Sequence, residues 1–446
     1  MENQEQLRED ISQKIDGIFE LREQEKKFIP GKTLVRYAGA VYDQAEVKAM
    51  IAAILDGWFG LGKQGEKFET GLAEFIGTKG GILTNSGSSA SLLATNGLMS
   101  TLLPESERLK PGDEIITPAC GFPTTINPAL ILGLVPVFLD VNLETCNINA
   151  DDLEKALSDK TRAIFLPHTL GNPNEMDKVV EFARAHRLYL VEDNCDALGS
   201  EYDGRKTGSF GDLATASFYP AHHITIGEGG MVFYNDEKFV QPIRSLRDWG
   251  RACHCRGDEQ SSLGACNNRF SFKINNRPCD HKYMYSQIGY NLKPVEFQAA
   301  MGVEQLKKLP EFIVRREHNF NRLYEQVKNL EEFFILPKSL PKAKPCWFAF
   351  PLTIRAGAPF DRLSIINYLE ERLIQTRPLF AGNIIRQPAY QQAKYRIVDE
   401  LKNSDYILHH TFFVGVYPGL DDAMIDYIAD NINGFIKHLS DLKSRV

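Results

Sequence analysis

The fold is decided by residues 162–193, which read RAIFLPHTLGNPNEMDKVVEFARAHRLYLVED. Two apolar, β-rich segments, Arg162–Leu166 and Leu188–Glu192, flank a helix-like stretch, Met176–Ala185. Two strands joined by a helix form a βαβ unit, whose strands run parallel within one sheet. This stretch therefore predicts a mostly parallel sheet with helices on both of its faces.

The same alternation continues on both sides of this unit. β-rich segments precede it at Asp113–Thr117 and Val135–Leu139, and another follows it at Ala214–Tyr219. The sequence therefore predicts a large α/β domain, and the ligands of such domains bind at the carboxyl ends of the strands.

We expect three parts along the chain. The highly charged residues 1–34 are interpreted as a helical arm, and residues 35–316 as the large domain. A charged helical sequence over Val303–Lys328 is followed by proline-rich connections. Residues 317–446 are therefore predicted to form a smaller α+β domain.

The composition is that of an ordinary globular protein, with 446 residues, 43% hydrophobic and 24% charged. The 58 acidic and 51 basic residues give a net charge of -7, which argues against general binding to nucleic acid or anionic membranes. The amino terminus lacks a secretory pattern, and the most apolar run, Pro128–Leu139, is short of the roughly 20 residues that span a bilayer. We expect a cytoplasmic protein.

A turn rich in serine and glycine precedes a helix-like run over residues 91–103. It reads Asn85-Ser86-Gly87-Ser88-Ser89-Ala90. Backbone amides and the hydroxyls of Ser88 and Ser89 at a helix amino terminus can bind a phosphate. Taken alone, such a turn is more often an ordinary N-cap.

Three more residues lie close to the ends of predicted strands. Asp193 can pair with a protonated ring nitrogen, and Ser217 can add a hydroxyl to a phosphate site. Phe122 can stack on a flat heterocycle. Each has an ordinary explanation by itself, as a cap, a turn residue and a core residue, so only their joint order favours a cofactor pocket.

Five motifs occur in a fixed order along the chain. They are Gly87-Ser88-Ser89-Ala90, Gly112-Asp113-Glu114, Glu192-Asp193, Ser217-Phe218 and Gly227-Glu228-Gly229-Gly230. In order and spacing they resemble the nucleotide-sugar aminotransferase and dehydrase family. That family uses pyridoxal phosphate in the aspartate-aminotransferase fold, which is fold type I. The resemblance covers roughly residues 35–308.

The resemblance implies roles for the residues of the predicted pocket. Ser88, Ser89 and Ser217 would hold the cofactor phosphate. Phe122 would stack on the pyridine ring, and Asp193 would pair with its nitrogen.

The resemblance also implies a second subunit and a sugar-binding segment. Asn291 matches a residue that reaches the phosphate from the neighbouring subunit, which implies a homodimer with shared sites. Arg377 and Asn383 match the segment that binds the nucleotide sugar, where an arginine can grip a diphosphate with two hydrogen bonds. An ordinary surface arginine is nearly as frequent at such a position.

An aminotransferase of this family needs a lysine five residues before Gly227, because a primary amine must form the Schiff base that tethers the cofactor. This chain has His222 there. An imidazole makes no such bond, but its reference pKa of about 6.5 suits proton transfer. We therefore expect a noncovalently held cofactor, pyridoxamine 5'-phosphate, with His222 as the base that removes a proton. Whether His223 contributes stays open, and one of the two should face away.

The cysteines are unevenly distributed. Four of the eight lie within residues 251–280, and these are Cys253, Cys255, Cys266 and Cys279. Cys195 lies two residues beyond Asp193, beside the predicted cofactor ring. Four thiolates suit either an iron–sulfur cluster or tetrahedral zinc, and the spacing does not separate the two.

His222 together with these cysteines resembles one branch of the family, the CDP-6-deoxy-4-hexulose 3-dehydrases. The resemblance implies a 2Fe-2S cluster with Cys195, Cys253 and Cys255 as ligands, and Cys266 as the fourth after a short insertion, with Cys279 as its competitor. It further implies removal of the C3 hydroxyl of CDP-4-keto-6-deoxy-glucose, with an NADH-dependent flavin and iron–sulfur reductase, in the 3,6-dideoxyhexose biosynthesis of bacterial lipopolysaccharide O-antigen.

Two alternatives compete with this interpretation. The first is a cluster-free dehydrase or aminotransferase that uses pyridoxal phosphate with glutamate as nitrogen donor, its cysteines binding zinc or nothing. The second is a noncatalytic regulator that binds pyridoxal phosphate.

Overall fold

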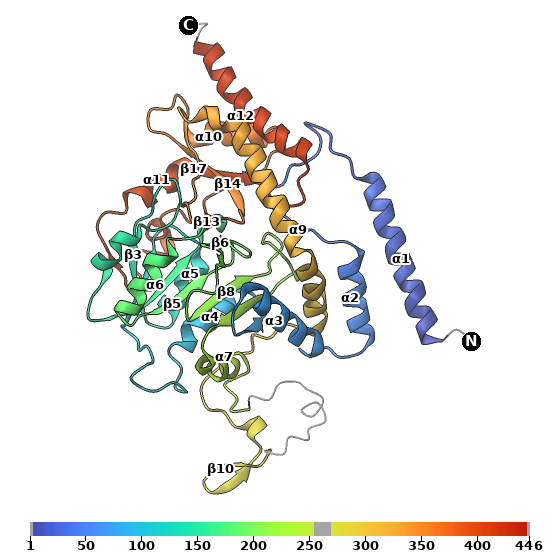
Figure 1. Ribbon diagram of the computed structural model, residues 1–446, viewed down its shortest axis with the longest axis vertical. Helices are drawn as coiled ribbons and strands as arrows, with labels where there is room; N and C mark the ends of the chain where they lie inside the picture. The colour runs from blue at the N-terminus through green and yellow to red at the C-terminus, as the bar shows by residue number, and fades with distance from the viewer. Residues whose placement is uncertain (1–2, 254–268, 444–446) are drawn as a thin grey trace.

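A sheet of eight strands forms the centre of the computed structural model, which describes residues 3–253 and 269–443 (Figure 1). The strands are β1 (Gly80–Thr84), β2 (Glu114–Pro118), β3 (Val135–Leu139), β4 (Thr161–Pro167), β5 (Tyr189–Asp193), β8 (Leu213–Ser217), β9 (Gly230–Tyr234) and β16 (Arg396–Ile397). Their order is β1-β9-β8-β5-β4-β2-β3-β16. β9 is antiparallel to both neighbours, and all other neighbours in this sheet pair in parallel. The predicted mostly parallel sheet is confirmed.

The helices are distributed over the whole chain. They are α1 (Gln4–Glu25), α2 (Gln44–Leu55), α3 (Lys63–Ile76), α4 (Gly87–Gly97), α5 (Pro123–Ile131), α6 (Met176–Ala185), α7 (Val240–Arg247), α9 (Glu296–Val327), α10 (Arg362–Glu370), α11 (Lys402–His410) and α12 (Asp422–Lys443). The stretch Ala150–Ala156 is a 3-10 helix.

Helices cover both faces of the sheet because successive side chains of a strand point to opposite faces. In β1, Ile82 packs in a core with the α4 residues Leu93 and Ala94. Its neighbour Leu83 packs in a second core, on the other face, which includes Phe68 of α3 and Leu309 of α9. All five residues of β2, β3 and β8 are buried, as expected for strands covered on both sides.

The carboxyl-terminal region contains a smaller antiparallel sheet of order β12-β14-β17-β15. Its strands are Phe334–Ile335 (β12), Ala349–Ile354 (β14), Arg377–Pro378 (β15) and Thr411–Gly415 (β17). The predicted boundary after residue 316 falls within α9, whose carboxyl-terminal half packs against this region.

The carboxyl-terminal region is also joined to the large sheet by strand pairing. β16 extends the large sheet in parallel beside β3. A further strand, β13 (Ala343–Lys344), pairs with β6 (Glu201–Tyr202), which in turn pairs with β7 (Arg205–Lys206). Residues 317–443 therefore form their own sheet and complete two others.

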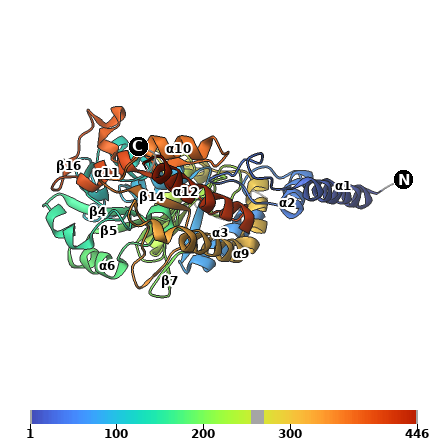
Figure 2. The same cartoon turned by 90° about the horizontal axis from the view of Figure 1, so that it is seen from above.

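Two elements project from the body of the molecule. Helix α1 stands away from it and contacts α2, with an ion pair between Arg8 and Asp56 (Figures 1 and 2). A hairpin of β10 (Phe272–Ile274) and β11 (Arg277–Cys279) extends below α7 in Figure 1. No helix within the described ranges has the length and apolar character that a membrane crossing requires.

Candidate active site

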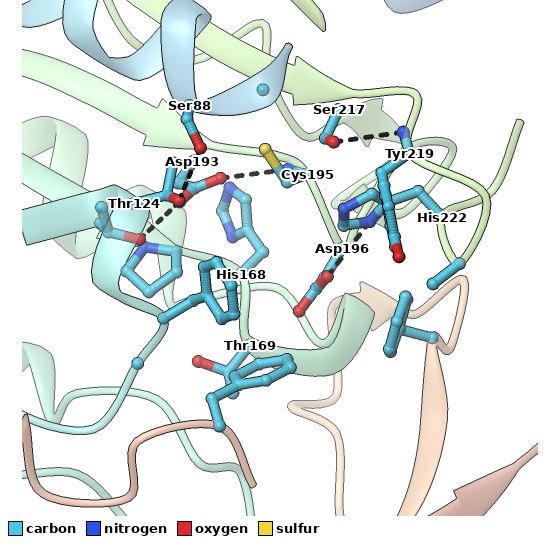
Figure 3. A pocket seen from close by; sticks show the side chains of 18 of the residues that line it. Ser88, Thr124, His168, Thr169, Asp193, Cys195, Asp196, Ser217, Tyr219 and His222 are labelled. Carbon is cyan, nitrogen blue, oxygen red and sulfur yellow. Dashed lines mark hydrogen bonds and ion pairs between the residues drawn. The ribbon is translucent and has the colours of Figure 1, made fainter. Parts of the chain in front are cut away.

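Seven predicted site residues surround one cavity of about 490 Å3 at the carboxyl ends of the large-sheet strands (Figure 3). They are Ser88, Phe122, Asp193, Cys195, Ser217, His222 and Arg377. Asp193 ends β5 and Ser217 ends β8, so the parallel sheet itself brings these two side chains together. The cavity lies where ligands of such sheets bind.

One wall of the cavity is the amino terminus of α4. The Ser86 hydroxyl caps this helix by accepting a hydrogen bond from the Ser89 amide at 3.0 Å. At Gly87 a Cβ atom would lie 2.5 Å from the Ser217 Cβ, so only glycine lets the end of β8 approach the helix. Ser86, Gly87 and Ser88, at the amino terminus of α4, line the cavity here, and a helix amino terminus is a suitable cradle for a phosphate.

The two neighbouring serines differ in their surroundings. Ser88 lines the cavity, and its Oγ lies 3.1 Å from the Thr124 hydroxyl. Ser89 is not among the lining residues, and its hydroxyl donates to Asn85 Oδ1 at 2.6 Å. The structure therefore brings Ser88 and Ser217 to the cavity, whereas Ser89 stabilises the turn that holds them.

Asp193 presents a carboxylate to the cavity floor although only 6% of the residue is exposed. Its Oδ2 accepts a hydrogen bond from the Thr125 hydroxyl at 2.5 Å, and its Oδ1 accepts one from the Cys195 amide at 3.2 Å. A carboxylate fixed in this way can pair with a protonated ring nitrogen. Phe122 is 52% exposed, so it is not a core residue, and its ring contacts Phe380 edge-on.

A buried pair behind the floor fixes the end of β5. His168 Nε2 lies 3.0 Å from Glu192 Oε2, and both side chains are fully buried. The Glu192 carboxylate also accepts three backbone N–H bonds, from Gly208, Phe210 and Gly211. Sequence analysis did not identify His168, and the buried glutamate before Asp193 was the only signal that could have pointed to such a support.

His222 lies across the cavity from Ser88, as Figure 3 shows. Its Nδ1 is 3.4 Å from Asp196 Oδ1, and its ring packs at 50° on Phe348 with centroids 5.6 Å apart. Among the described residues, those that line this cavity include no lysine. The position expected to carry a Schiff-base lysine therefore carries an imidazole beside a carboxylate.

His223 faces away from the cavity. It is 3% exposed, and its Nε2 lies 2.9 Å from the carbonyl oxygen of Cys346. Burial, together with the nearby Arg316 guanidinium, lowers the pKa of His223 well below its usual range. Of the two adjacent histidines, only His222 can therefore meet a ligand in the cavity.

Comparison with known proteins agrees with this geometry. Residues 41–433 match the DegT/DnrJ/EryC1/StrS aminotransferase family. The chain belongs to this family.

Two curated relatives and one solved structure are informative. The chain is 49% identical over 418 residues to dTDP-4-dehydro-2,6-dideoxy-D-glucose 3-dehydratase of Saccharopolyspora spinosa, covering 93% of this chain and 89% of that protein. It is 44% identical over 431 residues to lipopolysaccharide biosynthesis protein RfbH of Salmonella typhimurium, covering 96% and 98%. The structure of E. coli GDP-4-keto-6-deoxy-D-mannose-3-dehydratase with bound hydrated PLP superimposes with a TM-score of 0.80 at 29% identity, covering 90% of this chain and 100% of that chain. The predicted aspartate-aminotransferase-like α/β fold is confirmed.

The predicted substrate residues of this DegT/DnrJ/EryC1/StrS family member are placed differently. Arg377 lines the cavity, where its guanidinium lies 4.5 Å from the centre of the Tyr37 ring. Asn383 is fully buried and donates a hydrogen bond to Asp405 at 2.8 Å. It is not among the cavity residues, so Arg377 and Tyr37 are the groups that can meet a substrate at this edge.

The predicted metal ligands do not form one group in the described part of the chain. Cys195 lines the cofactor cavity, whereas Cys253 lines a second cavity of about 600 Å3 and Cys279 ends the β10–β11 hairpin. Within residues 3–253 and 269–443, no three His, Cys, Asp or Glu side chains are grouped so as to hold a metal ion. Cys255 and Cys266 lie outside the described residues.

The Cys195 thiol has an unusual environment. Burial, followed by the charge of Asp193 and that of Asp196, raises its pKa well above the usual range. A thiolate at this position would therefore require a compensating positive charge nearby.

Asn291 lies outside the cofactor cavity and is exposed. It forms an isolated antiparallel bridge with Asp248, a residue that lines the second cavity. Lys293 and Arg251 flank the Trp249 ring in this second cavity, with the Lys293 Nζ 3.6 Å from the ring centre. Burial lowers the pKa of Lys293.

Proposed function

We propose that this chain is a pyridoxamine phosphate-dependent dehydratase that removes the C3 hydroxyl of a nucleotide-linked 4-keto-6-deoxyhexose. One observation carries the proposal: a cavity with the groups needed for a pyridoxal-type cofactor has His222, beside Asp196, where the tethering lysine is expected. The relatives named as 3-dehydratases support it.

The residues present fit the cofactor. The α4 amino terminus with Ser88 and Ser217 suits the phosphate, the Asp193 carboxylate suits the ring nitrogen, and the exposed Phe122 offers a face to the ring. Bound there, pyridoxamine phosphate would supply a primary amine that condenses with the 4-keto group and a ring that accepts electrons.

His222 acts as the general base in this proposal. The Asp196 carboxylate lies 3.4 Å from Nδ1 without a hydrogen bond to it, and its charge would attract a proton to Nδ1, leaving Nε2 to accept the proton of the cofactor. Phe348 restricts the ring from one side. Because no lysine competes for the cofactor within the described cavity lining, the amine of the cofactor stays available to the sugar.

The nucleotide sugar is proposed to be CDP-4-keto-6-deoxy-glucose, on the path to 3,6-dideoxyhexoses of lipopolysaccharide. Arg377, stacked on Tyr37 at the cavity edge, would bind the diphosphate. The relative named as a lipopolysaccharide biosynthesis protein supports the pathway, whereas CDP as the nucleotide rests on the resemblance of the cysteines and His222. A higher kcat/KM with the dTDP-linked sugar than with the CDP-linked sugar would contradict it.

We further propose that the two electrons for this deoxygenation come from an NADH-dependent flavin and iron–sulfur reductase through a 2Fe-2S cluster. Its ligands would be Cys195 in the cavity together with Cys253, Cys255 and Cys266. The enzyme would be a homodimer, in which Asn291 of each chain reaches the cofactor phosphate of the other. Zinc alone, or no metal, with glutamate-dependent turnover would favour the cluster-free alternative.

The decisive experiment replaces His222 with Asn. We expect exchange of the cofactor methylene hydrogens with solvent to fall about 10²- to 10⁴-fold, since general base catalysis contributes about that much. Binding of pyridoxamine phosphate should change little, because its contacts lie on the other walls. Exchange is followed by NMR in D2O.

His318→Asn is the matched control. His318 lies on α9 outside the cavity, where its half-exposed side chain pairs with Asp422 of α12. It should exchange at the wild-type rate. Normal exchange in His222→Asn would exclude the proposed base. Pyridoxal trapped on the wild-type chain by borohydride would overturn the proposal as a whole, and binding without any turnover would favour a regulator.

A further inference from the structure

A buried arginine lies directly behind His222. Arg316, in the middle of α9, is 1% exposed and is among the largest fully buried side chains. Among the described residues its guanidinium forms no ion pair within 4.0 Å. Burial lowers its pKa to about 10, while the more distant charge of Asp196 acts in the opposite direction. The group is therefore still a cation at neutral pH, held in the interior without an ion-pair partner.

The donors of this cation are directed at backbone carbonyls. One terminal nitrogen donates to the carbonyls of Trp347 and Phe348, at 3.2 and 3.1 Å. The other donates to the carbonyl of His222 at 3.3 Å. The Nε has no hydrogen-bond partner. Arg316 therefore joins the segment that carries His222 to the segment that carries Phe348.

The joined segments are the two that determine where the imidazole lies. The ring of Phe348 packs on the ring of His222, and His223 lies 2.9 Å from the Cys346 carbonyl in the same segment, which precedes β14. Loss of the Arg316 contacts would leave the His222 carbonyl and the Phe348 carbonyl without their shared donor. The distance between the two rings would then no longer be fixed from behind.

Stability does not account for this arrangement. A buried cation without a carboxylate partner carries a large desolvation cost, and an apolar side chain of similar volume would avoid that cost. The neighbouring Arg315 shows the ordinary alternative, since it pairs with Asp422 at 2.8 Å near the surface. A cation retained in an unfavourable place, with all its formed bonds directed at the two segments, indicates a function in the site.

We propose that Arg316 is a positioning residue for His222, holding its backbone and the Phe348 ring so that the imidazole stays beside Asp196 at the cavity wall. This inference rests on the proposed function of His222 as the base. Arg316 does not line the cofactor cavity and so touches neither cofactor nor substrate there.

The test compares three variants of the full-length holoenzyme. Arg316→Met removes all donors at similar length, Arg316→Lys keeps one cationic donor, and Arg315→Met is the matched control on the same helix. For Arg316→Met we expect methylene exchange to fall about 10- to 100-fold, with the KM for the sugar and the cofactor affinity within about threefold of wild type. Arg316→Lys should recover part of the rate, and Arg315→Met should match wild type.

A second measurement needs no cofactor. Ring signals of isotope-labelled histidine in the cofactor-free protein are assigned to His222 by their loss in His222→Asn. They should move in Arg316→Met and stay in place in Arg315→Met. If Arg316→Met does not fold, Arg316→Lys carries the same two readouts, and unchanged rate and unchanged His222 signals in that folded variant would overturn the proposal.

The outcomes separate this inference from the proposed function. Exchange in Arg316→Met within about twofold of wild type, with unmoved His222 signals, would overturn the positioning role while a loss of exchange in His222→Asn still supported the dehydratase. Normal exchange in His222→Asn would overturn His222 as the base. Displaced His222 signals in Arg316→Met would then still show that Arg316 fixes the position of the ring.

Discussion

The cofactor cavity and the cysteine-rich segment, residues 251–280, hold their functional side chains in different ways. In the cavity, Asp193 and Ser217 are fixed by neighbouring parallel strands, and Ser88 by a capped helix. The described cysteines of the segment, Cys253 and Cys279, lie at a cavity edge and on a projecting hairpin. The site at the strand ends is formed by the folding of the sheet, whereas a metal site built mainly from the cysteine-rich segment would depend on the metal for its order.

The largest effect is expected from Cys195→Ser, because Cys195 is the one proposed cluster ligand that belongs to the cavity. Wild-type protein purified without oxygen should contain about two iron and two sulfide per chain, and the variant should lose nearly all of both. Iron and sulfide analysis measures this.

Cys266→Ser and Cys279→Ser distinguish the proposed fourth ligand, Cys266, from its competitor, Cys279. Cys279→Ser should keep its iron and Cys266→Ser should lose it. Full iron in Cys195→Ser would show that Cys195 is not a cluster ligand, and it would contradict the proposed electron transfer from the cysteine-rich segment to the cavity.

Sequence reasoning succeeded where local pattern and fold coincide. The strand at Val135–Leu139 and the helix at Met176–Ala185 have the predicted bounds, because continuous apolar runs and helical periodicity are local signals. β1 and β9 were not predicted. Both begin at glycine, and their strand character comes from antiparallel pairing, of β1 with β9 and of β9 with β8, which is not visible locally.

The site was predicted to the extent that its residues form motifs. Asp193, Ser217 and His222 lie in the cavity as their motifs suggested. Ser89 and Asn383 do not line it, since their side chains bond to Asn85 and Asp405 instead. The further support of the site comes from Asp196, Arg316 and Phe348, and only long-range packing brings these three around His222.

A smaller effect is expected from Asp193→Asn, which tests whether the cavity binds the cofactor ring through a side chain that the sheet already holds in place. The variant keeps the shape but loses the charge that would pair with the ring nitrogen. A hydrogen bond to a charged group contributes about 1.5–3 kcal/mol, so the Kd of pyridoxamine phosphate should rise about 10- to 100-fold. Absorbance titration of cofactor-free protein measures it.

Asp212→Asn is its control. Asp212 directly precedes β8 and lies outside the cavity, where it accepts a hydrogen bond at 2.9 Å from the amide of Leu190, on the same strand as Asp193. Its substitution should leave the Kd unchanged. Equal Kd values for Asp193→Asn and wild type would show that the ring nitrogen is bound elsewhere.

The smallest effect concerns the thiols of the two regions in metal-free protein. Burial, Asp193 and Asp196 raise the pKa of Cys195, so little thiolate is present at pH 8. Iodoacetamide should therefore modify Cys279 at least about tenfold faster than Cys195, because the thiolate is the nucleophile. The rate at Cys195 should still rise about tenfold per pH unit above pH 8, as mass spectrometry of the two peptides would show.

The raised pKa of Cys195 also makes the stability of the fold depend on pH. The stability falls with rising pH, whereas a paired carboxylate loses its contribution as the pH falls. The folded chain holds the Cys195 proton more tightly than the unfolded chain, whose thiol titrates at about 8.5. This contribution is present below that pH and is lost as the pH rises above it. Cys195→Ser should therefore show a weaker fall of Tm between pH 8 and 10 than wild type. Equal alkylation rates at Cys195 and Cys279, with parallel Tm curves, would mean that the two regions do not differ in the way their thiols are held.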